Sequence, residues 1–274
     1  MAQLTITPKL ERLRDLLTGY KRVVIAYSGG VDSAFLAKIA FETLKENAIA
    51  VTAVSPSYSV DELEETKRIA REIGIHHVII TTYEMENPNY RTNPANRCYF
   101  CKSELYSRLK PVAEKFKAEY ILDGLNMDDT RDIRHGIKAA REHGIISPLN
   151  EASLTKIEIR ELSKRLGMRI WDKPATPCLS SRVEYGIEIS PEILRQIENA
   201  ESFLREIGLK NFRVRYHRHI ARIEAEPVEF EEILRQRERI VAKFKELGFI
   251  YITLDLQGFR TGSMNEILNI VKLR

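Results

Sequence analysis

The chain has 274 residues, of which 43% are hydrophobic and 30% are charged, and its formal net charge is +4. This composition is typical of a globular protein with one large or two modest domains, and it excludes collagen-like and low-complexity classes. The positive excess is too small for sequence-independent binding to duplex nucleic acid by bulk charge. The three cysteines are too few, and odd in number, for a disulfide-stapled secreted domain.

Two further patterns bear on where the protein works. No apolar run approaches the roughly 20 residues that span a bilayer. The start of the chain also lacks a basic region followed by an apolar core, which is the pattern of a signal peptide. We therefore expect a cytoplasmic protein with no membrane partner. In that compartment, a Cys-x-x-Cys pair with a third cysteine indicates metal, cluster or sulfur chemistry.

The chain up to Trp171 alternates helix and strand patterns. The elements predicted, in order, are a helix at 10–17, a strand at 22–27, a helix at 32–44, a strand at 49–54, a capped helix at 59–74, strands at 78–81, 120–123 and 145–147, and a capped helix at 155–167. Repeated strand–helix–strand units predict an α/β fold, an open parallel sheet with helices on both faces. Ligands of such sheets bind beyond the carboxyl ends of the strands.

The pattern changes after Trp171. Residues 172–178 include two prolines, which predict an ordered loop rather than a helix or a central strand. The elements predicted beyond it are a helix starting at Ser190, a strand at 212–216, a long helix at 227–247 and a strand at 250–254. We therefore expect two domains, 1–184 and 185–274, of which the second is a smaller α/β module.

The segment Ser28-Gly-Gly-Val-Asp-Ser33 lies between a predicted buried strand and a predicted helix. Two glycines let the backbone approach an anion, and the N–H groups at the positive end of the helix point to the same place. Ser28 and Ser33 add hydroxyl donors, whereas Asp32 suits Mg²⁺ or an orienting role. A bare Gly-Gly would indicate only a turn, but the longer pattern favours a phosphate site. The Gly-Lys-Ser/Thr pattern of P-loop kinases and GTPases is absent.

This loop resembles the signature of the PP-loop ATP pyrophosphatases, which have the adenine nucleotide alpha hydrolase-like fold. The resemblance implies cleavage of ATP between the α and β phosphates, adenylation of a substrate oxygen and release of pyrophosphate. Asp123-Gly-Leu-Asn-Met-Asp-Asp129 supports it, because similar enzymes carry Gly-x-Asn-x-Asp near the nucleotide. By itself, that segment would indicate only a turn and a cap. The residues that the resemblance assigns to ATP and Mg²⁺ are Ser28, Gly29, Gly30, Asp32, Ser33, Gly124, Asn126 and Asp129.

The cysteines fall in two places. Cys98-Tyr-Phe-Cys101 lies at a predicted helix start, and Cys178 lies in the proline-containing loop. A tetrahedral zinc site would need a fourth ligand, and the histidines nearest in sequence to the pair are His76, His77 and His135. Three thiolates suffice for a 4Fe-4S cluster with one iron left open. The alternative for Cys178 is a small buried apolar residue, but the neighbouring Arg182 favours a reactive thiol.

These motifs, with 96–102, 174–182 and 258–263, resemble the LarE family across nearly the whole chain. Members of that family are ATP-dependent sulfur transferases that build the nickel-pincer cofactor of lactate racemase. The resemblance implies that the substrate is pyridinium-3,5-biscarboxylic acid mononucleotide, whose carboxylates are adenylated and converted to thiocarboxylates. It also implies a homo-oligomer, either a hexamer or a dimer.

Two mechanisms occur in the LarE family. In one, a single cysteine that matches Cys178 gives up its own sulfur and becomes dehydroalanine. In the other, three cysteines hold a 4Fe-4S cluster that carries a labile sulfide. Because all three positions are present here, the resemblance favours the cluster form on Cys98, Cys101 and Cys178, with Asp32 as the fourth catalytic residue. The sulfide donor is left open.

The predicted second domain contains a group of arginines. Arg213 and Arg215 alternate with apolar residues, so both project from one face of a strand, and Arg260 lies in a glycine-flanked turn. Spacing alone fits a solvated strand face equally well. The resemblance assigns these three arginines to the phosphate of the substrate nucleotide, which a guanidinium fork suits. Arg218 and Arg222 extend the basic group but match no motif.

Three other functions remain open. A tRNA thiolation enzyme of the same superfamily would act on a nucleobase, but such enzymes often carry extra zinc-binding cysteine pairs or an RNA-binding appendage. This chain has neither, and we expect no nucleic-acid partner. An ammonia-using adenylating ligase would leave the three cysteines unexplained. A non-catalytic iron–sulfur or nucleotide-sensing module would bind ATP without releasing pyrophosphate.

Overall fold

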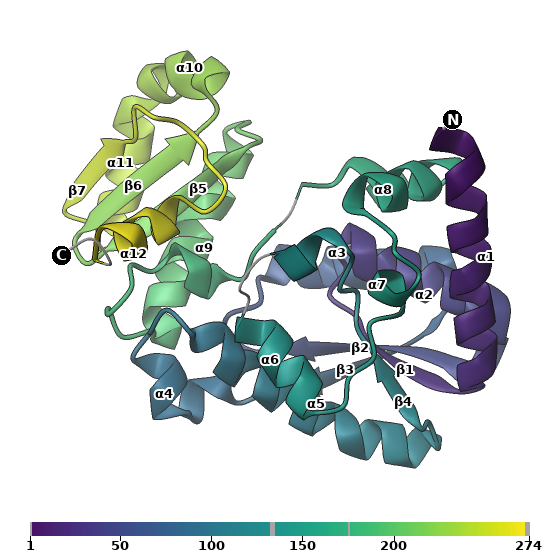
Figure 1. Cartoon of the computed structure of the whole chain (residues 1–274). Helices are drawn as coiled ribbons and strands as arrows, with labels where there is room; N and C mark the ends of the chain where they lie inside the picture. Colours follow the sequence, from purple (N-terminus) through teal and green to yellow (C-terminus); the bar gives the residue numbers. More distant parts are fainter. Residues whose placement is uncertain (1, 132–134, 175, 272–274) are drawn as a thin grey trace. The chain divides into compact units, whose positions relative to one another are not determined.

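The computed structural model describes residues 2–131, 135–174 and 176–271 (Figure 1). The chain divides into two compact units, each assembled from separate stretches. The first unit comprises Met1–Ser55, Val60–Glu84 and Cys98–Thr176, and the second comprises Pro56–Ser59, Met85–Arg97 and Pro177–Arg274. The division of the chain into domains at residue 184 stays a prediction. No sequence pattern predicts that the stretches 56–59 and 85–97 belong with the later part of the chain.

The first unit is built on a parallel sheet. Its strands are β1 Val23–Ala26, β2 Ala48–Val54, β3 His76–Thr81 and β4 Tyr120–Leu122, in the order β3-β2-β1-β4. Val23 of β1 lies opposite Ala48 on one side and Tyr120 on the other, and every pairing in this sheet is parallel. The predicted α/β class with a parallel sheet is therefore confirmed.

One strand prediction in this part of the chain is wrong. Residues 145–147 form no strand, and Ile146 makes only an isolated parallel bridge to Leu122. The pairing stops there because Pro148 begins helix α7, Pro148–Glu151. Proline has no N–H to donate to a sheet and suits the first position of a helix.

Helices cover both faces of this sheet (Figure 1). They are α1 Ala2–Tyr20, α2 Val31–Leu44, α3 Val60–Ile73, α5 Arg97–Phe116, α6 His135–Glu142, α7 and α8 Lys156–Arg165, with short 3₁₀ segments at Lys45–Asn47, Glu84–Glu86, Asp128–Arg131 and Arg169–Asp172. Val23 and Ile25 of β1 belong to a core with α1, α2, α3 and α8, whereas Val24 belongs to a core with α5 and α6. Successive residues of β1 point to opposite faces of the sheet, so this strand contributes side chains to both cores.

Helix α8 begins with the capping box that the sequence predicts. The hydroxyl of Thr155 accepts a hydrogen bond from the N–H of Glu158 at 3.3 Å, and Oε2 of Glu158 accepts one from the N–H of Thr155 at 2.9 Å. The Glu158 carboxylate also pairs with Lys9 of α1 at 2.7 Å. The cap therefore joins the start of α8 to α1.

The second unit contains a mixed sheet. Its strands are β5 Phe212–His217, β6 Ile220–Ala225 and β7 Tyr251–Leu254, with β5 and β6 antiparallel and β6 and β7 parallel. Its helices are α4 Pro88–Arg91, α9 Pro191–Glu206, α10 Phe230–Arg235, α11 Arg237–Glu246 and α12 Glu266–Val271, with 3₁₀ segments at Leu179–Arg182, Pro227–Glu229 and Ser263–Asn265. Ser190 caps α9 by accepting from the N–H of Ile193, as its sequence predicts.

Two features of the second unit differ from the sequence prediction. Strand β6 was not predicted, because the turn before it uses Arg218 at φ 58° instead of the Asn-Gly type of turn that marks hairpins. The single helix predicted over 227–247 is interrupted at Gln236, whose ψ is 7°. The apolar pattern continues through the interruption, since Ile233 and Ile240 are both buried. Periodicity alone therefore hides the break.

Among the described residues, none of the helices combines the length and apolar character needed to cross a membrane.

Candidate functional site

The predicted phosphate loop connects β1 to α2. Gly29 turns the chain with φ 69°, and a Cβ atom added to it would lie 2.0 Å from Oγ1 of Thr66 in α3. This close approach explains why the position takes glycine. Gly30 is the N-cap of α2, so the first N–H groups of the helix open at the end of the loop.

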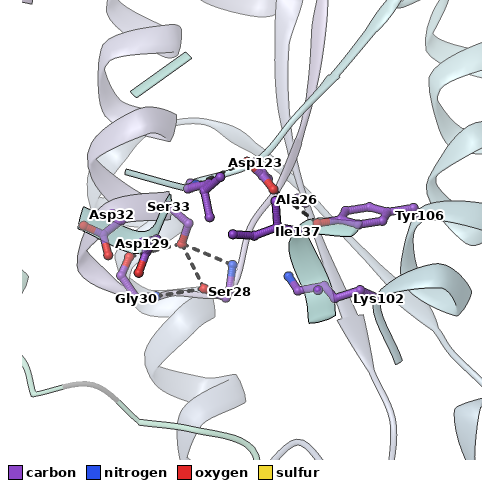
Figure 2. A pocket seen from close by; sticks show the side chains of 13 residues that line it. Ala26, Ser28, Gly30, Asp32, Ser33, Lys102, Tyr106, Asp123, Asp129 and Ile137 are labelled. Carbon is purple, nitrogen blue, oxygen red and sulfur yellow. Dashed lines mark hydrogen bonds between the residues drawn. The ribbon is translucent and has the colours of Figure 1, made fainter. Parts of the chain in front are cut away.

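The two loop serines stabilise the shape of the loop. Ser33 Oγ accepts from the N–H of Ser28 at 3.2 Å and donates to the main-chain oxygen of Gly30 at 3.1 Å. The hydroxyls of Ser28 and Ser33 lie 3.1 Å apart, and Figure 2 shows these contacts across the loop. Hydrogen bonding from these hydroxyls to a phosphate stays a prediction.

A cavity of about 310 Å³ lies at the carboxyl ends of β1 and β4. Its lining combines Ser28, Gly30, Asp32 and Ser33 with Gly124, Asp129, and Lys102 and Tyr106 of α5 (Figure 2). Two loops that are distant in sequence meet here because β1 and β4 are neighbours in the sheet. A Cβ atom on Gly124 would lie 2.9 Å from the main-chain nitrogen of Ser33. The loop after β4 therefore packs backbone to backbone on the start of α2.

Asp32 is the carboxylate at the centre of this arrangement. Burial raises its pKa, the positive charge of Lys156 opposes that shift, and the negative charge of Asp129 adds to it. Asn126 is fully buried, and its side-chain oxygen accepts from the N–H groups of Asp128 and Asp129 at 2.9 and 3.2 Å. Within the described residues, Oδ1 of Asp32 and Nδ2 of Asn126 are buried without a hydrogen-bond partner. Such orphaned atoms fit a ligand site.

The residues present fit Mg²⁺ bound together with a nucleotide. Mg²⁺ is usually held by one or two carboxylates plus phosphate oxygens and waters. Asp32 and Asp129 offer such carboxylates. In the part of the chain that the structure describes, no group of three or more His, Cys, Asp or Glu side chains is arranged to hold a metal ion. The carboxylates alone therefore form only part of a coordination sphere.

Lys102 and Tyr106 are pocket residues for which the sequence predicted no role. The ammonium of Lys102 lies 5.5 Å from the ring centroid of Tyr106. Its interactions with Tyr106 and Asp123 raise its pKa although burial acts in the opposite direction, so the side chain carries a positive charge in the pocket. Burial raises the pKa of Tyr106 to about 12, and its hydroxyl donates to Asp123 at 3.2 Å. The only signal in the sequence is that Lys102 directly follows Cys101 in the family-like segment.

The three cysteines are distributed over the two units. Cys98 and Cys101 lie on the first turns of α5 in the first unit, where Cys98 is exposed and Cys101 is half-buried. Cys178 belongs to the second unit and is exposed, which excludes the alternative that it is a buried apolar residue. A single site formed by all three cysteines stays a prediction.

Arg182 holds the backbone around Cys178. Its side chain is 2% exposed and donates to the main-chain oxygens of Pro177 and, at 3.1 Å, of Cys178. Its Nε donates to Glu201 of α9 at 3.1 Å. Burial alone would raise the pKa of Glu201, but Arg182 and the N–H of Val214 hold it below its ordinary value. A buried ion pair thus anchors the cysteine loop to α9.

Further contacts fix the chain just after Cys178. The hydroxyls of Tyr90 and Ser180 lie 2.6 Å apart in a buried contact. Asn93 donates to the main-chain oxygen of Val183 at 3.3 Å and to that of Glu184 at 2.8 Å. The stretch 85–97 therefore belongs to the second unit because its side chains hold this loop.

The predicted phosphate-binding arginines of the second unit are paired with acidic and main-chain groups. Arg215 donates to Glu224 at 2.9 Å, to Ser263 at 2.9 Å and to the main-chain oxygen of Ser181 at 3.1 Å. Burial lowers the pKa of Arg213 to about 10. Arg260 pairs with Glu266 at 3.1 Å and is closer to solvent. Whether these side chains hold a phosphate is not tested by these contacts, and the assignment stays a prediction.

The fold and the pocket together identify the class of protein. A parallel α/β sheet with a Ser-Gly-Gly-x-Asp-Ser loop at the carboxyl end of β1 is the architecture of a PP-loop, ATP-using enzyme. The family model described as NAD synthase matches residues 11–116, which include this loop.

Comparison with known proteins identifies the family within this class. The chain is 35% identical to pyridinium-3,5-bisthiocarboxylic acid mononucleotide synthase of Lactiplantibacillus plantarum, over 98% of both chains. It is 48% identical to an uncharacterised protein of Synechocystis, over 95% of this chain and 98% of the other. A tRNA-specific 2-thiouridylase of Halothermothrix orenii is 28% identical over 56% of this chain and 53% of its own. The chain therefore belongs to the LarE family of PP-loop proteins.

Proposed function

We propose that this protein is an ATP-dependent sulfur transferase. Its substrate is pyridinium-3,5-biscarboxylic acid mononucleotide, whose carboxylates it adenylates and converts to thiocarboxylates for the nickel-pincer cofactor of lactate racemase. The observation that carries the proposal is the cavity that unites the phosphate loop, the Asp32 carboxylate with its buried and unpartnered Oδ1, and the Lys102 ammonium. The near full-length similarity to a synthase of this product supports the choice of substrate.

The adenylation step follows from the groups around this cavity. A carboxylate oxygen of the substrate attacks the α-phosphorus of ATP, the bond from that phosphorus to its bridging oxygen breaks, and pyrophosphate leaves. N–H groups at the start of α2 and the positive end of that helix stabilise the charge on the phosphates. Lys102 neutralises charge on the departing pyrophosphate. Asp32 and Asp129 would hold Mg²⁺, which would neutralise phosphate charge when bound.

In the second step, sulfide attacks the adenylated carbonyl carbon, the bond to AMP breaks, and a thiocarboxylate forms. We propose that Cys98, Cys101 and Cys178 hold a 4Fe-4S cluster, whose open iron would supply this sulfide. Three thiols are the donor set that such a cluster requires. The alternative within the family is that Cys178 donates its own sulfur. Its exposed position on an anchored loop suits either role.

We assign the phosphate of the substrate nucleotide to Arg213, Arg215 and Arg260. Guanidinium groups suit a phosphate because they offer several N–H donors in one plane. We further propose a cytoplasmic homo-oligomer, either a hexamer or a dimer. The identity of the sulfide donor is left open.

An anaerobic assay tests the function. Protein, ATP, Mg²⁺, sulfide and the biscarboxylic mononucleotide are mixed, and pyrophosphate release and oxygen-to-sulfur exchange in the product are measured, the latter by mass spectrometry. We expect both with the unaltered protein. Asp32→Asn should lower pyrophosphate release by roughly 10²–10³-fold, the size of effect seen when one charge-stabilising group is removed. Copurifying tRNA whose binding falls with salt, without product formation, would favour the tRNA thiolation alternative instead.

Three cysteine variants decide the sulfur source. If the cluster carries the sulfide, Cys98→Ser, Cys101→Ser and Cys178→Ser each abolish thiocarboxylate formation while pyrophosphate release continues, and the unaltered protein contains iron and acid-labile sulfide. If Cys178 is the donor, Cys98→Ser and Cys101→Ser retain one turnover. In that case Cys178 becomes dehydroalanine and loses the mass of hydrogen sulfide, that is, of its sulfur and two hydrogens.

A further inference from the structure

A chain of hydrogen bonds, made by buried side chains and the half-buried His77, lies behind the phosphate loop. It involves Tyr27, the residue directly before the loop, together with Thr52 of β2, Thr66 of α3 and His77 of β3. Tyr27 is 2% exposed, and Thr52 and Thr66 are fully buried. These side chains do not line the cavity, so they contribute to it only by way of the backbone that they hold.

Both main-chain groups of Tyr27 are bonded to β2. Its N–H donates to the main-chain oxygen of Val51 at 2.9 Å, and its carbonyl accepts from the hydroxyl of Thr52 at 2.8 Å. The first bond continues the parallel pairing of β1 and β2 one residue beyond the strand. In the second bond a side-chain hydroxyl is the donor. The backbone is thus held at the point where it leaves the sheet.

The proton arrangement of this chain follows from the donors available. A threonine hydroxyl has one proton, and the carbonyl of Tyr27 has none, so the Thr52 proton must lie toward that carbonyl. Nε2 of His77 lies 2.8 Å from the same hydroxyl oxygen and must therefore donate to it. Burial lowers the pKa of His77, with Lys67 and His76 adding to the shift, which is consistent with a neutral ring protonated at Nε2.

A second set of contacts holds the next peptide. The hydroxyl of Tyr27 donates to the main-chain oxygen of Thr66 at 3.3 Å, and the hydroxyl of Thr66 donates to the carbonyl of Ser28 at 3.5 Å. In a planar trans peptide the carbonyl and the following N–H point in opposite directions. A Ser28 carbonyl directed at Thr66 therefore turns the N–H of Gly29 away from α3.

We propose that Thr52 and Thr66 are positioning residues for adenylation. By holding the carbonyls of Tyr27 and Ser28, they fix the two peptides that open the phosphate loop, so that the Ser28 N–H donates to Ser33 Oγ within the loop and the Gly29 N–H is turned away from α3. The inference rests on the proposed use of ATP by this pocket. His77 acts one step further out, by directing the single proton of Thr52 to the Tyr27 carbonyl. The shape of the loop matters most where charge develops on the phosphates, so a distorted loop lowers the rate of the chemical step.

The test is Thr52→Val, which keeps the shape of the side chain and removes the hydroxyl. Pyrophosphate release with substrate and MgATP should show kcat/KM for ATP lower by roughly 10- to 100-fold, and Thr52→Ser should restore most of it. The matched control is Thr253→Val. Thr253 of β7 donates to the main-chain oxygen of Ala221 at 3.2 Å, a similar strand contact in the other unit. This control should leave kcat/KM unchanged, and it should lower Tm less than Thr52→Val because Thr253 is exposed.

The possible outcomes distinguish the positioning role of Thr52 and Thr66 from the proposed ATP-dependent function. An unchanged kcat/KM in Thr52→Val, no recovery in Thr52→Ser, or an equal loss in Thr253→Val would overturn the positioning role. If Thr52→Val does not fold, Thr66→Val and Thr66→Ser are compared in the same way. If the unaltered protein binds MgATP in calorimetry but releases no pyrophosphate, the proposed function fails. The positioning role is then judged by whether Thr52→Val weakens MgATP binding and Thr52→Ser restores it.

Discussion

The phosphate-loop pocket of the first unit and the Arg182–Glu201 ion pair of the second unit use buried polar groups in opposite ways. In the pocket, Asp32 and Asn126 each keep a buried atom without a partner among the described residues. In the second unit, the buried side chain of Arg182 pairs with Glu201.

This difference separates groups kept for a ligand from groups used to hold the chain. Leaving a buried polar atom unpaired costs stability, so an unpaired atom in a cavity indicates a ligand that completes its hydrogen bonds or coordination. A paired and buried charge instead fixes its neighbours, here the loop that carries Cys178. Substitutions in the pocket should therefore change mainly the activity, and substitutions at the buried ion pair should change mainly the free energy of unfolding.

The largest change in stability is expected from Arg182→Met. It leaves the Glu201 carboxylate buried without its guanidinium, and breaking such a pair costs about 3–5 kcal/mol of unfolding free energy. Chemical denaturation measures the loss. Arg195→Met is the control, because its pair with Glu192 at 3.2 Å is exposed, and it should change stability little. Equal effects of the two substitutions would show that the buried Arg182–Glu201 pair holds the chain no more firmly than an exposed pair does.

The same pair predicts a pH dependence. Because the pKa of Glu201 is held below its ordinary value of 4.5, its contribution to stability is complete above pH 4.5 and is lost as the pH falls through the lowered value. In Arg182→Met, burial is left as the main influence and raises this pKa. Acidification should then recover part of the stability that the substitution removes. Denaturation curves across the acidic range would reveal this opposite slope.

A smaller effect on stability, with a large effect on activity, is expected from Gly29→Ala. Gly29 and Gly167 share a φ of 69°, but a Cβ on Gly29 would collide with Thr66 whereas one on Gly167 would meet nothing within 4 Å. Gly167→Ala should therefore cost about 1–2 kcal/mol for its backbone alone. Gly29→Ala should also lower pyrophosphate release by at least roughly tenfold. Similar activity in both variants would show that the contact with Thr66 does not position the loop.

The smallest effect is expected from Thr155→Ala at the start of α8. The substitution removes the capping box and should lower the unfolding free energy by about 1 kcal/mol. Pyrophosphate release should stay unchanged, since Thr155 does not line the cavity. A fall in this activity would extend the functional region of the first unit beyond its pocket.

Local patterns in the sequence predicted the parts of the site that lie on continuous segments. The β-branched run before Ser28 and the glycines after it sufficed for β1 and its loop. Lys102 was missed because a lysine near the start of a helix is ordinarily solvated, and only the packing of α5 beside β4 places it in the pocket. The role of Thr52 depends on the register of β2 against β1, which spacing along one strand does not encode.

The second unit was harder to predict for a related reason. Arg218 adopts a positive φ without being glycine or asparagine, so the hairpin between β5 and β6 carried no turn signal. The stretch 85–97 joins this unit through Tyr90 and Asn93, whose partners lie far along the chain. Contacts between distant segments are invisible to periodicity.

The tight packing around Gly124 limits which substitutions the protein tolerates at this position. Gly124 packs directly on the backbone of Ser33, which cannot move aside as a flexible side chain could. Even the smallest mutation that adds a carbon at position 124 pushes against the start of α2. Whether a substitution at position 124 is tolerated therefore depends on the phosphate loop, which lies much earlier in the chain. A lineage that keeps using the phosphate loop is expected to inherit this glycine unchanged, while one that has lost the activity is free to replace it.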